Sequence, residues 1–206
     1  MRKKSALLFI ILVSTASCIY SQNSVEDSTF RRCFVGSSGF ILSNLFPQEN
    51  PPSYYQLNVG YWLTKKDVIS IEVKTWTYRF PIGIPYGSSF EAPGEEYPGK
   101  VRSVGIGAAY QRFLWKGLYS AVHASAWSQQ YFNEKNEKIQ NGFQLFTALR
   151  LGYHIKLFKN RFFIEPSFAG TYWPVNTNVP TAFVAKERKW NNFFLVEPGL
   201  HFGVKF

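Results

Sequence analysis

The feature that most constrains this fold is a period-two alternation of apolar residues with small or polar ones, which recurs in eight segments. The clearest segment, 143–157, reads "FQLFTALRLGYHIKL", and every second residue from Phe143 to Leu157 is apolar or threonine. Successive side chains of a β-strand point to opposite faces, so this period predicts strands with one apolar face. The other segments are 32–46, 53–64, 67–80, 101–115, 118–132, 161–173 and 191–206. In the first of these the pattern leaves open which residues share a face.

The connections between these segments fall into two classes that alternate along the chain. Three are tight turns, at residues 65–66, 116–117 and 159–160, where Gly117 and Asn160 suit the positive φ of hairpin turns. Four are long, at residues 47–52, 81–100, 133–141 and 174–191. Strict alternation predicts an up-and-down meander with all tight turns at one end. Closing eight antiparallel strands into a barrel leaves no unpaired edge, so we predict an all-β, eight-stranded, up-and-down barrel.

The first 21 residues have the layout of a secretory signal peptide. Three cations are followed by an apolar run from Ala6 to Val13 and then by small residues. Cleavage after Ser21 would leave one domain, residues 22–206, with Cys33 as its lone cysteine. A lipoprotein signal acylated at Cys18 is the alternative.

The charge of the chain gives weak information about partners. The signal carries three of the 23 Lys and Arg residues and none of the 13 acids, so the mature net charge is 20 − 13 = +7. A basic protein can bind nucleic acid, but no Lys/Arg block or Gly-rich phosphate loop supports that function here. An exported basic chain meets anionic lipid head groups first.

The residues between the apolar positions indicate which face of the barrel points outward. They are mainly Gly, Ala, Ser, Gln and Asn with isolated charges, which suits a filled small lumen. A soluble barrel would show water a face dense in Lys, Glu and Asp. We therefore predict that the apolar face contacts lipid and the barrel is transmembrane. Aromatic residues near both segment ends suggest two interfacial girdles: Tyr54, Tyr55, Trp76, Tyr78, Trp127, Tyr131, Tyr172, Trp173 and Trp190; and Tyr61, Trp62, Trp115, Tyr119 and Tyr153.

The C-terminal segment "GLHFGVKF" supports the same prediction. Leu200, Phe202, Val204 and the terminal Phe206 alternate with polar or small residues, a pattern similar to the C-terminal signal that barrel-assembly machinery recognises. With the export signal, strand count and loop asymmetry, the mature chain resembles the small eight-stranded outer-membrane barrels of the OmpA/OmpX type. The resemblance implies an integral outer-membrane protein that contacts outer-membrane lipid and lipopolysaccharide, with its tight turns in the periplasm.

The same resemblance implies a lumen plugged by an ionic network, and the inward positions supply charged residues for one. Charges inside a low-dielectric wall must pair, because an unpaired one costs several kcal/mol. An eight-stranded lumen has room for little beyond side chains, although a narrow pore is an alternative. The network residues we predict are Glu72, Lys74, Arg150, Glu165, Glu197, His201 and Lys205.

The one motif that suggests catalysis is His123 and Ser125, which is similar to the His-x-Ser pair of outer-membrane lipid A deacylases. Ala126 stands where that family has Asn, no acid is evident to orient the base, and both residues should face the lumen. His154 and His201 have no evident third partner, so we expect no metal, and no motif indicates a cofactor.

We therefore expect a structural or surface-binding role, with an unknown extracellular ligand at loops 81–100 and 174–191. A lipid A-modifying hydrolase and a narrow pore are the alternatives. Pro166 and Pro198 cannot donate to the sheet, so we expect local bulges or water contacts there.

Overall fold

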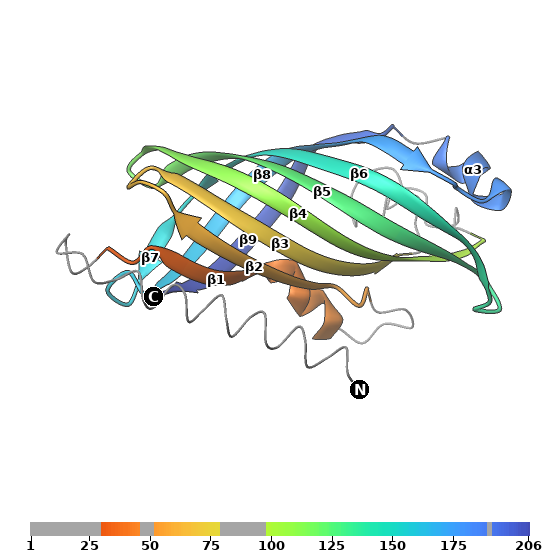
Figure 1. Ribbon diagram of the computed structural model, residues 1–206, viewed down its shortest axis with the longest axis horizontal. Coiled ribbons are helices and arrows are strands. Elements are labelled where there is room, and N and C mark those ends of the chain that lie inside the picture. Colours follow the sequence, from red (N-terminus) through yellow and green to blue (C-terminus); the bar gives the residue numbers. More distant parts are fainter. Residues whose placement is uncertain (1–29, 46–51, 79–97, 189–190) are drawn as a thin grey trace.

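The computed structural model describes residues 30–45, 52–78, 98–188 and 191–206, which form one antiparallel sheet (Figure 1). The predicted signal peptide and most of loop 81–100 lie outside these residues. Two short helices lie in the connections, the 3-10 helix η1 (Gly39–Leu45) and the α-helix α3 (Thr181–Glu187). Neither is long and apolar enough to cross a membrane, and the described part of the chain has no helix that is. The strands are β1 (Cys33–Ser38), β2 (Tyr55–Trp62), β3 (Asp67–Tyr78), β4 (Gly99–Trp115), β5 (Leu118–Asn133), β6 (Lys138–Tyr153), β7 (Ile155–Leu157), β8 (Phe162–Thr177) and β9 (Phe193–Lys205).

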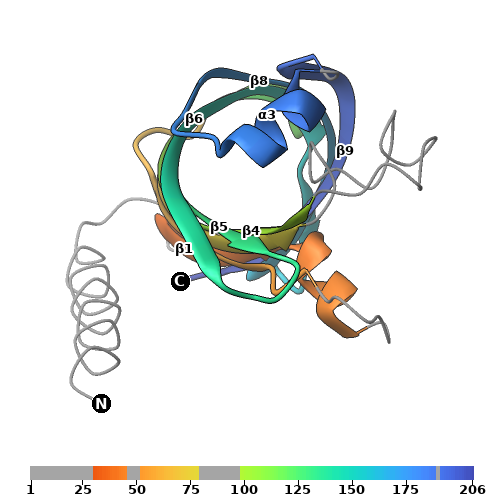
Figure 2. The ribbon, with the colours of Figure 1, turned by 90° about the vertical axis from the view of Figure 1, so that its right-hand side faces the viewer.

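The sheet closes into a ring, as the alternation predicts. Strands β1 to β6 pair in sequence order, β6 and β7 both pair with β8, β8 pairs with β9, and β9 pairs with β1 (Figure 2). Strands β6 and β7 are one strand interrupted at His154, whose amide donates to the Gly117 carbonyl at 2.8 Å. The ring therefore has eight strands, and the predicted fold class is confirmed.

Exposure confirms which face points outward. On the outer wall, Ile106 is 61% exposed and Leu149 is 61% exposed, whereas on the inner wall Glu72 is 1% exposed and Arg150 is 7% exposed. The structure also assigns the first strand. Val35 pairs with Val59 and Val204 on the outer face, and Ser38 is buried on the inner face.

The tight turns lie at one end of the barrel and both helices at the other (Figure 1). Lys116 and Gly117 have positive φ, as do Lys159 and Asn160, which agrees with the hairpin turns predicted there. One predicted long connection is wrong: β6 begins at Lys138, so only residues 134–137 join β5 to β6. Strands β5 and β6 extend beyond the apolar band on this side, into residues assigned to that loop.

One smaller expectation is also wrong. Tyr54, Trp62, Tyr119, Trp127, Tyr131 and Trp173 are buried rather than in outer girdles, because they share strand parity with lumen residues.

The two prolines of β8 and β9 pair in register, Pro166 with Leu200 and Pro198 with Phe168. The bulge of this strand pair lies between Phe194 and Glu197 on β9, directly before Pro198, whereas the pairing on both sides of Pro166 is regular.

Cys33 is buried, at 2% exposure, and is disulfide-bonded. The only other cysteine in the sequence, Cys18, lies outside the described residues. The expected lone cysteine applies to a chain cleaved after Ser21.

Candidate functional site

Two glycines on the lumen face of β4 make room for the central charged residues. A Cβ at Gly105 would lie 2.6 Å from the Trp127 ring, and one at Gly107 would lie 2.3 Å from Ser125 Oγ. Because β4 has no side chains at these two positions, side chains from β3 and β5 meet across it. The Gly-x-Gly spacing follows from the two-residue period of the strand.

Glu72 lies at the centre of the lumen and holds two partners. Its Oε2 is 2.6 Å from Lys74 Nζ, and its Oε1 is 3.0 Å from His123 Nδ1. Lys74 is on the same strand and face, whereas His123 reaches Glu72 from β5. Because the carboxylate can only accept, His123 carries its proton on Nδ1. The side chain of Glu72 is 1% exposed, so these two partners replace its water.

Arg150 of β6 forms the second half of this arrangement. Its Nη2 lies 3.6 Å from Glu197 Oε1, and its Nη1 donates to Ser167 Oγ at 2.9 Å. The His201 ring stacks near His123, with centroids 6.5 Å apart. We call Glu72, Lys74, His123, Arg150 and Glu197 the central cluster. It contains two fixed cations and two carboxylates, so its charges balance.

A cavity of about 410 Å³ lies above the central cluster in the loop-side half of the lumen. Four buried polar atoms of its lining have no hydrogen-bond partner in the described part of the chain: Ser103 Oγ, His123 Nε2, Trp127 Nε1 and Arg150 Nε. The cavity can therefore hydrogen-bond to water or to a small polar guest. Its aromatic lining residues are Phe40, Tyr54, Trp76, Tyr78, Trp127, Phe146 and Trp173.

A separate set of charged residues lies toward the tight turns. Lys205 Nζ donates to His154 Nε2 at 2.8 Å, and His154 Nδ1 lies 2.6 Å from Glu165 Oε1. A lysine ammonium can only donate, so His154 Nε2 is the unprotonated acceptor. The neutral ring carries its proton on Nδ1. Gln111 donates to the same Glu165 oxygen at 3.0 Å, and Asn160 accepts from Lys205 at 3.2 Å. Lys205, His154 and Glu165 thus form a hydrogen-bonded chain.

The seven predicted network residues do not form one network. Glu72 and Lys74 meet, Arg150 meets Glu197, and Glu165 connects to Lys205 only through His154. His201 contacts the central cluster through its ring. His123 and His154 were not predicted as partners of the carboxylates. Their inward parity was the available signal, but their pairing depends on strand register, which the pattern does not specify.

In the structure, His123 of the His123 and Ser125 motif contacts a carboxylate but makes no hydrogen bond to Ser125 Oγ. Glu72 is a carboxylate on His123 Nδ1, which the sequence did not reveal. Ser125 is 2% exposed, however, and neither its Oγ nor His123 Nε2 has a hydrogen-bond partner in the described residues. The base and the hydroxyl are therefore not joined as a dyad. Across the described part of the chain, no three His, Cys, Asp or Glu residues are placed to hold a metal.

At the loop end, α3 lies across the mouth of the ring (Figure 2). Phe183 is fully buried and packs edge-on against Tyr131, with ring centroids 5.2 Å apart. Val101 and Val179 complete this contact. Phe183 of loop 174–191 thus packs against the rim, whereas Ala182 and Ala185 of the same helix are exposed.

A closed antiparallel ring with an apolar outer wall and charges inside defines the class of the outer-membrane β-barrels. No protein-family model matches the chain, and no curated protein does. Solved structures that resemble it are outer-membrane barrels. The N-terminal β-barrel domain of Pseudomonas aeruginosa OprF is 15% identical, with a TM-score of 0.43 over 85% of this chain and 98% of that one.

Two further structures are similar at the same level. A major outer membrane protein from Thermus thermophilus is 11% identical, with a TM-score of 0.48 over 85% of this chain and 98% of that one. Ail of Yersinia pestis, solved with the heparin analogue sucrose octasulfate, is 11% identical, with a TM-score of 0.40 over 85% and 94%. At these values the likenesses carry no assignment of function, and the barrel architecture follows from the strand pairing itself.

Proposed function

We propose that this protein is an integral outer-membrane barrel that acts through its loop-side surface, as a structural or binding protein, and not by transport or catalysis. The observation that carries the proposal is the segregation of the wall. Apolar side chains such as Ile71, Ile106 and Leu149 are exposed outside, while charged ones are buried inside and paired. Water disfavours such an outer face, and lipid favours it.

Partners follow from the same arrangement. The outer wall would contact outer-membrane lipid and lipopolysaccharide, and the end of β9 would serve the barrel-assembly machinery. Leu200, Phe202 and Val204 are 40–44% exposed on the outer face. Phe206 pairs its backbone with Cys33 at both N and O, which joins the last strand to the first. Loops 81–100 and 174–191 would supply the surface for an extracellular ligand.

The first experiment is the gel mobility of detergent-extracted protein before and after boiling. Outer-membrane barrels stay folded in cold detergent, so we expect a shift on heating. Ile106→Lys places a charge at the middle of β4 and should reduce the folded, membrane-inserted fraction, because lysine at the bilayer midplane costs roughly 2–4 kcal/mol. Gln130→Lys, near the loop end of β5, is the matched control. Equal insertion of the two variants would contradict a lipid-facing wall.

Transport is tested in planar bilayers. The central cluster and the chain from Lys205 to Glu165 fill the lumen at two levels, so we expect no single-channel steps. Regular steps would favour the narrow pore.

A hydrolase is the second candidate, because Glu72 is placed to orient His123. The test compares lipid A mass spectra from cells with the protein, without it and with His123→Ala. We expect identical spectra. Loss of an acyl chain that depends on the protein and on His123 would replace the binding role with a catalytic one.

A further inference from the structure

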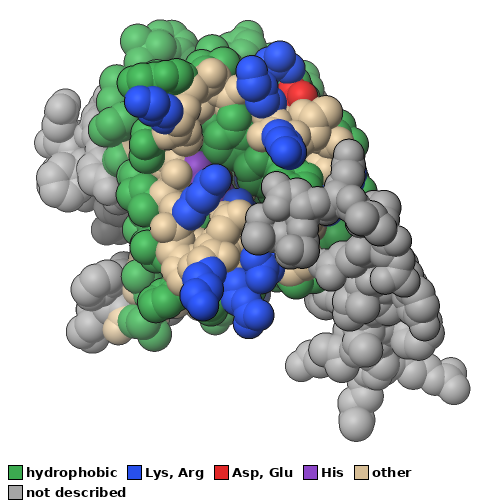
Figure 3. Space-filling view, turned by 90° about the vertical axis from the view of Figure 1, so that its left-hand side faces the viewer, with side chains coloured by type: hydrophobic (Ala, Val, Ile, Leu, Met, Phe, Trp, Pro, Cys, Tyr) green, Lys and Arg blue, Asp and Glu red, His purple; other side chains and the backbone are tan. Residues whose placement is uncertain are grey.

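The tight-turn end of the barrel has a pocket that is lined by cations and aromatic rings. Its volume is about 380 Å³, and no Asp or Glu is among the described residues that line it. Lys and Arg side chains gather around the hollow at this end, with little acidic surface beside them (Figure 3). The cations that line it, which we call the basic mouth, are Arg31, Lys65, Lys66, Lys116, Lys156 and Lys205.

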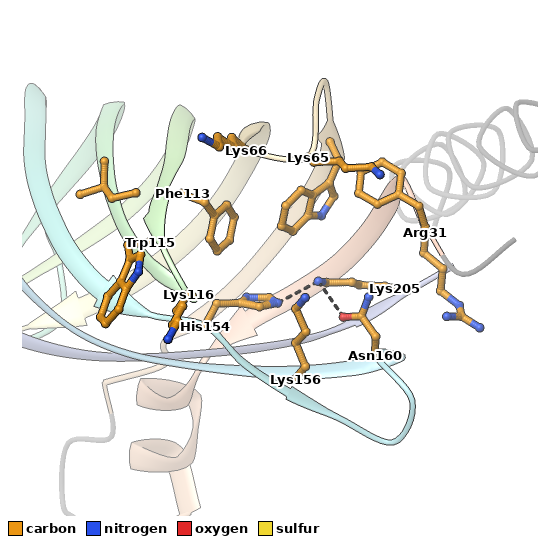
Figure 4. Close-up of a pocket in the computed structure, with 14 residues that line it drawn as sticks. Arg31, Lys65, Lys66, Phe113, Trp115, Lys116, His154, Lys156, Asn160 and Lys205 are labelled. Atoms are coloured by element: carbon orange, nitrogen blue, oxygen red, sulfur yellow. Dashed lines mark hydrogen bonds between the residues drawn. The ribbon is translucent and has the colours of Figure 1, made fainter. Parts of the chain in front are cut away.

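These cations come from several strands and turns and lie around the pocket (Figure 4). Lys66 lies in the turn between β2 and β3, Lys116 in the turn between β4 and β5, Lys156 in β7, and Lys205 at the end of β9. A pocket built from opposite sides of the barrel lies at its open end, on the axis. It faces the aqueous space beyond the turns, whereas the lipid-facing wall is the outer surface of the strands.

The acids described near this end do not line the pocket. Asp67 accepts from Arg112 and Tyr110, both at 2.6 Å, and none of these three residues lines the pocket. Glu165 lies deeper and accepts from His154 and Gln111. Like charges that share a pocket repel one another, and a bound anion would relieve that repulsion.

Aromatic rings form the rest of the lining. Trp115 is 67% exposed, and Lys116 Nζ lies 4.9 Å from its ring centroid. Deeper in, Trp62 stacks on Phe113 with centroids 4.8 Å apart, and Lys205 Nζ lies 4.5 Å over the Trp62 ring. An anionic ligand that binds these lysines would place an attached ring beside Trp115 or Phe113. Flat groups stack favourably on such faces.

We propose that the basic mouth is a binding site for a soluble anion that joins two or more negative charges to a flat apolar group, as an aromatic phosphate ester does. The site goes beyond the loop-side role proposed above and does not depend on it, because it lies at the opposite end of the barrel. The cations supply affinity and the rings supply preference for the apolar part.

The test uses the full chain folded in uncharged detergent micelles, with phenyl phosphate as probe, inorganic phosphate and phenol as comparison ligands, and calorimetry as readout. We expect phenyl phosphate to bind most tightly, and added salt to weaken it, because ions screen exposed charges. The variant Lys66→Gln/Lys116→Gln/Lys156→Gln should bind it roughly tenfold more weakly or worse.

The matched control is Lys135→Gln/Lys138→Gln/Arg188→Gln, which removes three exposed cations from the loop end. It should bind phenyl phosphate as the wild type does. Equal binding by both triple variants, or equal loss in both, would overturn the proposal. Folding of each variant is verified by its heat-dependent gel shift, so that misfolded protein is not counted as a loss of binding.

Two further arms test the chemistry and the source of the ligand. Trp115→Ala should reduce the preference for phenyl phosphate over inorganic phosphate and leave the affinity for inorganic phosphate unchanged. An unchanged preference would overturn the aromatic part of the site. Phosphatidylglycerol added to the micelles should not compete with phenyl phosphate. Competition would assign the lysines to lipid head groups and overturn the axial, soluble site.

Discussion

The central cluster and the basic mouth are both charged regions of one lumen, yet they are built by opposite rules. In the central cluster each carboxylate lies against a cation, as Glu72 does against Lys74 and Glu197 does against Arg150. In the basic mouth six cations line one pocket with no acid among its described lining residues. The charges of the central cluster therefore balance, whereas the basic mouth has a net positive charge.

Burial accounts for the difference. Glu72 is 1% exposed, so without partners its charge would cost several kcal/mol. Lys66, Lys116 and Lys156 are exposed at the tight turns, where water solvates them and no internal partner is needed. Pairing in the central cluster therefore serves stability. The charges of Lys66, Lys116 and Lys156 meet no folding requirement of this kind and can bind a ligand.

Glu72→Gln should have the largest effect on stability. It leaves Lys74 and His123 without their carboxylate in the lumen, and breaking a buried pair in this way costs about 3–5 kcal/mol. The measurement is the urea midpoint of the folded fraction on unboiled gels. Glu134→Gln, at an exposed position in the turn after β5, is the control. Equal midpoints for the two variants would show that the central cluster does not stabilise the barrel.

Gly107→Ala tests whether the central cluster depends on the bare wall of β4. The new methyl group would lie 2.3 Å from Ser125 Oγ and 2.7 Å from the Ala124 carbonyl oxygen. We expect a loss of about 1–3 kcal/mol, typical of overpacking. Ala108→Gly changes the neighbouring outward residue and should cost less, because that side chain is exposed. A larger loss for Ala108→Gly would argue against a packed wall.

Lys205→Met tests the boundary between the two regions. Methionine keeps the apolar stem beside Trp62, but His154 Nε2 loses its donor. The His154 and Glu165 contact remains, so we expect a loss of about 1 kcal/mol in the same urea assay. A loss as large as that of Glu72→Gln would mean that the inner end of the mouth is as strongly coupled to stability as the central cluster.

Much of the fold could be predicted from the sequence because it depends on local alternation. The apolar set from Phe143 to Leu157 and the turn at Gly117 are sufficient to predict outward faces and hairpins. The end of the loop after Asn133 could not be predicted, since a strand that extends beyond the apolar band has no apolar pattern there. Helix α3 was missed because seven residues are too few to show helical periodicity.

The candidate sites were less predictable, because they depend on which strands become neighbours in space. Glu72 and His123 are 51 positions apart and meet only through the gap over Gly107. The basic mouth joins residues from both ends of the described chain, and in sequence three of the six, Lys65, Lys66 and Lys116, are ordinary turn lysines. Parity indicated that Lys205 faces inward, but only ring closure brings it near Lys66 and Lys116.

The smallest expected effect comes from the acid at the outer edge of the tight-turn end. Asp67 accepts from Arg112 and Tyr110 on the outside of the barrel, and exposed pairs of this kind contribute little to stability. Asp67→Asn should leave the urea midpoint unchanged. It also makes the tight-turn end more positive without touching a pocket residue, so phenyl phosphate should bind slightly more tightly at low salt and equally at high salt. Weaker binding at low salt would contradict an electrostatic basis for the basic mouth.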